Sequence, residues 1–103
     1  MDEKKHEMVI CIVNAGFSGE VMEVAHKLGV KGGTMLHARG TANKEAETIF
    51  KITVTPEKDI LFMVVERTIT EVVLKALYEK VGLGTDANGI AFVLPVTNQV
   101  GIK

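Results

Sequence analysis

The chain has 103 residues, of which 47% are hydrophobic and 24% charged, and its formal net charge is −1 at pH 7. This composition excludes an intrinsically disordered chain, and the near-neutral charge excludes broad nucleic-acid binding, which needs a dense positive field. We therefore expect a single globular domain over residues 1–103, with no nucleic-acid partner.

The chain carries no sign of secretion or of membrane insertion. Its single cysteine, Cys11, stands in an apolar run and indicates a buried thiol in a reducing compartment. Residues 1–7 are too charged to act as a signal peptide, and no apolar run reaches the length of a membrane-spanning helix. We expect a cytoplasmic protein that is not itself embedded in a membrane.

The first predicted elements are a strand, a helix and a second strand. Residues 8–13 (MVICIV) form a continuous apolar run that favours a central strand. From 19 to 28, apolar residues recur three and four apart, which predicts an amphipathic helix. Ser18 is the expected N-cap of this helix, and Gly29 is its expected stop. Residues 34–39 form the next predicted strand.

A hairpin is predicted in the middle of the chain, after the polar residues 40–48. Residues 49–54 alternate in polarity in their second half, and residues 60–65 (ILFMVV) form an apolar run. Both segments indicate strands. The intervening residues 55–59 contain Pro56, whose fixed φ and missing N–H group favour a turn. The two strands are therefore expected to pair with each other.

The last predicted elements are a helix and a strand. Thr68 is expected to cap a helix with an apolar face, which ends near Gly82. Residues 83–89 are expected to form a loop. Residues 90–96 (IAFVLPV) predict the final strand, and Pro95 indicates a sheet edge or a strand end.

This order of elements predicts an α+β ferredoxin-like βαββαβ sandwich, in which an antiparallel sheet carries two helices on one face. The helices can cover only that face. Yet residues 8–13, 60–65 and 90–94 are apolar at successive positions, and therefore on both faces of their strands. The second face needs a cover, which a homo-oligomer with inward-facing sheets would supply.

Two glycine-bearing loops, residues 32–41 and 86–93, each adjoin a predicted strand and are expected to converge on one small anionic ligand. His37 and Arg39 stand two residues apart on a strand, so their side chains share a face. A guanidinium group suits phosphate. A solvated strand end explains the pair equally well.

Two further positions have both a functional and a plain structural interpretation. Gly40 permits close approach of a ligand to the backbone, and a turn alone also explains it. Asn88-Gly89 lies between a helix and a strand, where backbone N–H groups can form an anion-binding nest. The same dipeptide is also a common turn sequence. The residues alone leave both interpretations open.

The sequence contains no catalytic constellation. The three histidines and Cys11 lack metal-ligand spacing, and neither a Walker loop nor a glycine-rich dinucleotide fingerprint is present. Two carboxylate pairs, Glu45 with Glu47 and Glu57 with Asp59, fall in predicted exposed loops, which favours solvation over catalysis. We expect neither enzymatic activity nor a metal within one chain, while a metal site between subunits stays open.

In these features the chain resembles the PII-type signalling family, in particular its diverged PII-like branch. The resemblance covers about residues 8–102 and rests on the order of elements and on three short motifs. Gly32-Gly33-Thr34 opens the second strand, Arg39-Gly40 closes it, and Asn88-Gly89-Ile90-Ala91-Phe92-Val93 opens the last strand.

The resemblance implies a homotrimer and a regulatory function. Such a protein binds an adenine nucleotide in clefts between its subunits and regulates a partner protein, such as a membrane transporter or an enzyme. The segment 41–59 stands at the position of the family's T-loop, a long loop that changes conformation with the ligand and docks on the partner.

The resemblance also implies roles for individual residues. Thr34 and its glycine neighbours line the adenine side, and the strand around Val64 contacts the base. Residues 39–41 form the base of the T-loop, and the loop 87–89 binds phosphates through backbone N–H groups. The implied nucleotide-binding residues are Gly33, Thr34, His37, Arg39, Gly40, Thr41, Val64, Ala87, Asn88 and Gly89.

The chain departs from the family's pattern where cations are expected. Better-known members carry Gly-Asp-Gly-Lys in the phosphate loop, where this chain has Ala87-Asn88-Gly89-Ile90. They also place arginines near the C-terminus, where residues 97–102 have none. Each lost charge-assisted contact removes roughly 1.5–3 kcal/mol, which favours ADP, AMP or cyclic AMP over ATP. A nucleotide-independent trimeric interaction module and a metal-binding ferredoxin-like trimer remain as alternatives.

Overall fold

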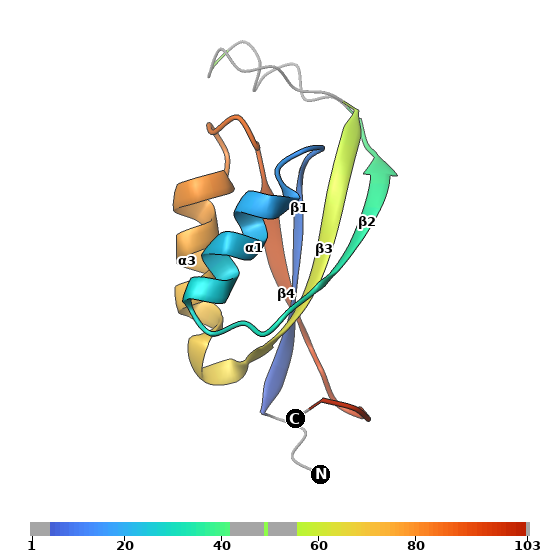
Figure 1. Cartoon of the computed structure of the whole chain (residues 1–103), viewed down its shortest axis with the longest axis vertical. Helices are drawn as coiled ribbons and strands as arrows, with labels where there is room; N and C mark the ends of the chain where they lie inside the picture. Colours follow the sequence, from blue (N-terminus) through green and yellow to red (C-terminus); the bar gives the residue numbers. More distant parts are fainter. Residues whose placement is uncertain (1–4, 42–48, 50–55, 103) are drawn as a thin grey trace.

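The computed structural model describes residues 5–41, 49 and 56–102. The strands are β1 (His6–Asn14), β2 (Thr34–Arg39), β3 (Glu57–Glu66) and β4 (Ile90–Pro95); the helices are α1 (Ser18–Lys27), the 3₁₀ turn η1 (Arg67–Ile69) and α3 (Thr70–Val81). The sheet order is β2-β3-β1-β4, and every neighbouring pair is antiparallel. Figure 1 shows both helices on one face of this sheet. The predicted ferredoxin-like sandwich is confirmed.

The apolar runs occupy the positions in the sheet that their composition predicts. β1 pairs with β3 on one side and with β4 on the other, which makes it a central strand. β4 lies at the sheet edge and ends at Pro95, one residue earlier than predicted. Neither described helix is long and apolar enough to cross a membrane.

One face of the sheet packs against the helices and forms the core. Side chains on β3 alternate, so that its odd-numbered positions from 59 to 65 are buried and its even-numbered ones are partly exposed. The sheet side of the core consists of Val9, Cys11, Val13, Leu61, Met63 and Val65. The helices contribute Val21, Ala25, Val73, Leu77 and Val81. Each helix therefore contacts the sheet with one face only, which is why its apolar residues recur three and four positions apart.

The opposite face of the sheet, called here the open face, is apolar and has no cover among the described residues. At its centre Ile10 lies between Phe62 and Phe92 and is 9% exposed. Around it Leu36, Phe92 and Leu94 are 50%, 43% and 48% exposed. The sequence-based inference that the strands are apolar on both faces is confirmed.

Both predicted N-caps are wrong. The N-cap of α1 is Phe17, whose carbonyl accepts from Val21 N–H at 3.2 Å, and Ser18 is the first helical residue. Thr68 lies inside η1, a 3₁₀ turn that moves the start of α3 to Thr70. The two residues were predicted as caps because serine and threonine side chains often accept a hydrogen bond at a helix start. Neither described helix uses such a side-chain hydrogen bond.

The predicted helix stops hold. Gly29 follows the end of α1 with a φ of +100°, a left-handed conformation that glycine adopts at little cost. Gly82 is the C-cap of α3 and donates its N–H to the carbonyl of Tyr78 at 3.2 Å. A glycine in the sequence therefore correctly predicted the end of each helix.

The predicted turn at residues 55–59 is wrong, because β3 already begins at Glu57 and most of these residues are strand. From Lys58 to Phe62, β3 pairs with β1 on one edge and with β2 on the other. The partner strand that the sequence predicted covers residues 49–54. Of those residues only Ile49 is described, and its backbone is helical. The rest of that predicted strand, and most of the segment 41–59, lie outside the described residues.

Cys11 provides a pH-dependent test of the core. Burial raises the pKa of its thiol from the ordinary 9.0 to about 11. Above pH 9 the unfolded chain loses this proton while the folded chain retains it, so stability should fall between about pH 9 and 11, by an amount on the order of 2–3 kcal/mol. Denaturant unfolding across this range would measure the loss. Cys11→Val should remove that part of the pH dependence, and an unchanged slope in the variant would contradict the assignment.

Candidate functional site

The sequence-predicted residues fall into two groups in the structure. Most of them lie at the end of the sheet where β2 ends, β3 begins and the 83–89 loop enters β4, called here the loop end (Figure 1). These residues are His37, Arg39, Gly40, Thr41, Ala87, Asn88 and Gly89. The others, Gly33, Thr34 and Val64, lie farther along β2 and β3.

Two cross-strand pairs join β2 to β3 at the loop end. His37 lies opposite Asp59, with 2.9 Å between His37 Nδ1 and Asp59 Oδ1. Arg39 lies opposite Glu57, and Arg39 Nη2 donates to Glu57 Oε1 at 2.6 Å. The prediction that His37 and Arg39 share one face is confirmed, because their partners also stand two residues apart on an adjacent strand.

Asp59 is a buried carboxylate that sequence reasoning missed. Its side chain is 3% exposed, whereas that of His37 is 81% exposed. The second oxygen of Asp59 accepts the N–H of Gly16 at 3.1 Å, so the same carboxylate orients the imidazole and ties the β1–α1 loop to β3. The prediction placed Asp59 in a solvated turn because it began the strand at residue 60. Only the correct start of β3 brings this carboxylate to the buried face.

A second polar cluster, formed by Asn14, Lys58 and the 83–89 loop, holds that loop against the sheet. Lys58 Nζ donates to Asn14 Oδ1 at 2.6 Å, and Asn14 Nδ2 donates to the carbonyl of Asp86 at 2.9 Å. The backbone N–H of Asn14 donates to the carbonyl of Ala87 at 2.8 Å. Partial burial lowers the pKa of Lys58. The end of β1 therefore connects the 83–89 loop to β3.

The turn at residues 88 and 89 uses its own N–H groups. Asn88 has a φ of +46° and donates its N–H to the carbonyl of Thr85 at 2.9 Å. Gly89 donates its N–H to the carbonyl of Val81 at 2.6 Å. These two groups are therefore not available to form an anion nest in this structure. Asn88 Oδ1 is buried and has no hydrogen-bond donor among the described residues.

Two of the groups that could bind an anion at the loop end contact carboxylates. Arg39 is bonded to Glu57, and His37 to Asp59. An incoming anion must therefore compete with a carboxylate for each of these two groups, whereas Lys58 is bonded to the amide oxygen of Asn14. Because Arg39 and Glu57 are largely exposed, their pair is weak and can exchange partners readily.

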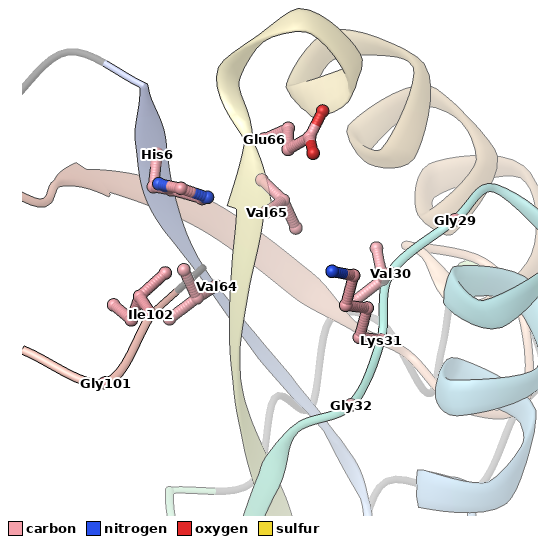
Figure 2. A pocket seen from close by; sticks show the side chains of 10 residues that line it. All are labelled: His6, Gly29, Val30, Lys31, Gly32, Val64, Val65, Glu66, Gly101 and Ile102. Carbon is pink, nitrogen blue, oxygen red and sulfur yellow. The ribbon is translucent and has the colours of Figure 1, made fainter. Parts of the chain in front are cut away.

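The second group of predicted residues surrounds an open strand edge. β2 pairs with β3 only from Glu57 to Phe62, so the β3 edge beyond Phe62 faces no strand among the described residues. A cavity of about 340 Å³, called here the edge cavity, opens there (Figure 2). Its lining consists of His6, Gly29, Val30, Lys31, Gly32, Val64, Val65, Glu66, Gly101 and Ile102.

Gly33 and Thr34 lie next to the edge cavity. Thr34 stands opposite Phe62, at the last paired position of the two strands. A Cβ at Gly33 would lie 3.0 Å from both the Phe62 carbonyl oxygen and Met63 Cγ. Glycine therefore permits the chain to approach β3 closely before β2 begins.

The two groups do not converge within one chain. Lys58 at the loop end and Val64 at the edge cavity lie six residues apart on β3, a separation of about 20 Å at the rise of a β-strand. The 39–41 part of the first glycine-bearing loop and the second loop lie at the same end of the sheet, but at its two opposite edges, with β3 and β1 between them. The expected convergence of the two loops on one ligand therefore does not occur within a single chain, and it stays a prediction for an assembly of chains.

The described residues form no metal site of the usual histidine, cysteine and carboxylate ligands, because no three such side chains come together among them. A partly polar cavity of about 520 Å³ lies beside η1 and is lined by Glu7, Arg67, Thr68, Thr70 and Glu71 among others. Another cavity of about 320 Å³ lies between α3 and β4, and most of its lining is apolar, including Leu74, Leu77 and Ile90.

Gly89 has a structural role that can be tested against a second glycine. A Cβ at Gly89 would lie 2.5 Å from the Val81 carbonyl oxygen and 2.9 Å from Val13 Cγ1, whereas one at Gly19 would meet no atom within 4 Å. We expect Gly89→Ala to destabilise the fold by about 1–3 kcal/mol. Gly19→Ala in α1 should stabilise it by roughly 0.5 kcal/mol. Denaturant unfolding measures both, and equal stability of the two variants would contradict this role of Gly89.

No protein-family model and no curated protein matches the sequence. Solved structures do match the fold. PII from Arabidopsis thaliana bound to citrate has a TM-score of 0.67 and 24% identity, covering 94% of this chain and 80% of that one. A putative PII-like signalling protein from Thermus thermophilus has a TM-score of 0.69 and 22% identity, covering 93% and 90%.

A third structure agrees with the first two. The GlnK–ATP complex from B. subtilis has a TM-score of 0.71 and 16% identity, covering 96% of this chain and 90% of that one. The likeness extends over nearly the whole chain in each case. The chain therefore has the fold of the PII and PII-like proteins.

Proposed function

We propose that this chain is a PII-like regulatory protein without enzymatic activity. In this proposal it forms a homotrimer, binds an adenine nucleotide in clefts between subunits, and regulates a partner protein, such as a membrane transporter or an enzyme, in the cytoplasm. The segment 41–59 would serve as the T-loop that contacts the partner.

The observation that carries the proposal is the edge cavity on an unpaired strand edge. The backbone of such an edge offers N–H and C=O groups in alternation, and adenine presents a hydrogen-bond donor beside an acceptor. Val30, Val64 and Ile102 supply apolar surface to the cavity. A flat heterocycle with a polar edge therefore fits this place better than a flexible charged ligand.

The structural neighbours support an anionic ligand. One of them holds ATP and another holds citrate. In this chain the group suited to phosphate is Arg39, which lies at the loop end rather than beside the edge cavity. If one nucleotide contacts both Arg39 and an edge cavity, the two must come from different copies of the chain. We therefore propose a site shared between two copies.

The open face supports such an assembly. Its apolar side chains are exposed in the single chain, and burying them against other copies would remove them from water. In this proposal the open faces of three copies pack together, and the edge cavity of one copy lies near the loop end of the next. The base and the phosphates would then contact different subunits.

The charge balance at the loop end supports a ligand with few phosphates. A phosphate group would have to replace Glu57 as the partner of Arg39. We therefore propose ADP, AMP or cyclic AMP as the preferred nucleotide, with ATP bound more weakly. The exchange also suggests how a bound ligand could affect the segment 41–59, because Arg39 precedes this segment and Glu57 belongs to its last part. The N–H of Gly40 donates to the Pro56 carbonyl at 2.7 Å beside this ion pair.

A nucleotide-independent trimeric interaction module is the second candidate. It is favoured by the N–H groups of Asn88 and Gly89, which already have acceptors within the chain. In that case the glycines of both loops would serve only the fold.

Titration calorimetry with ATP, ADP, AMP and cyclic AMP, with the mass determined by light scattering, decides between these candidates. We expect a trimer that binds about one nucleotide per subunit. A trimer that binds none of the four at millimolar concentration would overturn the nucleotide proposal and support the interaction module.

Variants at the loop end test the exchange of partners at Arg39. Arg39→Ala should weaken nucleotide binding roughly tenfold or more, as expected for a lost charge-assisted contact. Glu57→Gln should strengthen it, because phosphate then has no carboxylate to displace. Lys27→Ala, which removes an exposed lysine of α1, is the control and should leave the affinity unchanged. Calorimetry measures all three, and an unaltered affinity in Arg39→Ala would remove Arg39 from the site.

Variants at the two faces of the molecule test the assembly. Phe92→Glu places a charge at the open face, where Phe92 lies beside Ile10, and should convert the trimer to monomers. Val72→Glu is the control, because Val72 is 53% exposed on α3, away from that face. We expect it to retain the trimer mass in light scattering. Dissociation of both variants, or of neither, would contradict assembly through the open face.

A further inference from the structure

Met35 and His37 lie on the same face of β2, two residues apart. They stand opposite Leu61 and Asp59 of β3, which are buried on the helix side of the sheet. Because residues directly opposite each other in neighbouring strands share a face, Met35 and His37 also belong to the helix side. None of the 6 residues of β2 is buried, and Met35 is 41% exposed. A thioether and an imidazole are therefore accessible together on one strand.

The carboxylate of Asp59 decides which nitrogen of His37 can bind a ligand. Asp59 Oδ1 lies 2.9 Å from His37 Nδ1, and the N–H of Gly16 donates to Asp59 Oδ2 at 3.1 Å. An ionised carboxylate only accepts hydrogen bonds, so Nδ1 is assigned the proton and Nε2 of the neutral imidazole keeps its lone pair. The buried carboxylate thus orients an imidazole whose side chain is 81% exposed.

This pairing of a carboxylate with an exposed imidazole is the one that metal-binding histidines use. A histidine that binds a metal through one ring nitrogen nearly always donates the N–H of the other to a carboxylate, a carbonyl or water. Such a partner fixes the tautomer and makes the ligand nitrogen more basic. Met35 adds a second ligand atom at a strand spacing of about 7 Å, which two long side chains can close around one ion.

The two ligand types select the ion. Structural Zn²⁺ sites take four ligands from thiolate, imidazole and carboxylate groups. No three such side chains come together in the part of the chain that the structure describes. Thioether sulfur is a soft ligand that favours Cu(I), a monovalent ion that needs fewer ligands than Zn²⁺. The pair of Met35 and His37 therefore fits Cu(I) better than a divalent metal.

We propose that Met35 Sδ and His37 Nε2 bind Cu(I), with Asp59 as the positioning residue behind His37. The helix side lies opposite the open face, so assembly through the open face would leave this site exposed. The inference goes beyond the proposed function and does not depend on it, because it involves neither a nucleotide nor a second copy. It gives His37 a role other than the nucleotide contact that the family resemblance implies.

Competition with a chromophoric Cu(I) chelator, under anaerobic and reducing conditions and without nucleotide, measures the affinity of the full chain. Asp59→Asn should weaken Cu(I) binding roughly ten- to a hundredfold, the range for the partner of a ligating histidine. Met35→Leu removes the sulfur and His37→Phe removes the ring nitrogens, and each should weaken binding at least as much. Both of these positions are exposed, so the two ligand variants test the site even if Asp59→Asn destabilises the fold.

Two variants outside β2 serve as controls. His26→Gln removes an exposed histidine of α1, and Met8→Leu removes a methionine of β1. Both should keep the native affinity for Cu(I). Methyl NMR should show that, of the 5 methionines, Met35 has the signal that shifts most when Cu(I) is added. Nitrogen NMR of the His37 ring should place the shift at Nε2, and a shift at Nδ1 would overturn the role of Asp59.

The outcomes separate this site from the nucleotide site. Native affinity in Met35→Leu or in His37→Phe, or equal losses in the control variants, would overturn the Cu(I) site. Zn²⁺ binding that depends on Met35 as strongly would overturn the choice of ion. Loss of the Cu(I) site leaves the proposed function standing, because nucleotide binding is measured separately. Absence of nucleotide binding likewise leaves a Cu(I) site that depends on Met35 and His37 standing.

Discussion

The pairing of β3 is the constraint on which the rest of the structure depends. From Lys58 to Phe62 this strand has a neighbour on both edges, and beyond Phe62 it has β1 alone among the described residues. The doubly paired half fixes the cross-strand pairs of His37 with Asp59 and of Arg39 with Glu57. The half that pairs only with β1 has a free edge, and the edge cavity opens along this edge. The pairing of β3 therefore determines where both groups of candidate site residues lie and how far apart they are.

The same register keeps the two groups of candidate site residues apart within one chain. Polar side chains are paired with one another at the loop end, whereas the edge cavity has a largely apolar lining to which His6, Lys31 and Glu66 add polar groups. A ligand with an apolar heterocycle and an anionic tail has chemistry suited to both places. The uncovered open face provides the physical reason for copies of the chain to associate. In the proposed function, assembly and ligand binding would both depend on a sheet that is covered on one face only.

The polar groups at the loop end differ in how firmly they are held. Asp59 is buried and contacts both His37 and Gly16, so its position is fixed by two elements besides its own. Arg39 and Glu57 are exposed, and their ion pair contributes little to stability. A buried carboxylate thus maintains the geometry while an exposed ion pair can exchange its partner. This division lets a ligand alter contacts beside the segment 41–59 without disrupting the core.

Features that depend on local periodicity could be predicted from the sequence. Strand alternation placed His37 and Arg39 on one face, helical spacing gave the buried face of α1, and apolar runs showed that the sheet needs a cover on both sides. Which strands pair became clear only in the folded chain. That pairing placed residues 57–59 of the predicted turn in β3, brought Asp59 to a buried face, and left one edge of β3 without a neighbouring strand beyond Phe62 among the described residues. The physical reason is that strand pairing joins residues far apart in the chain, and neither the free edge of β3 nor the burial of Asp59 exists until those distant segments meet.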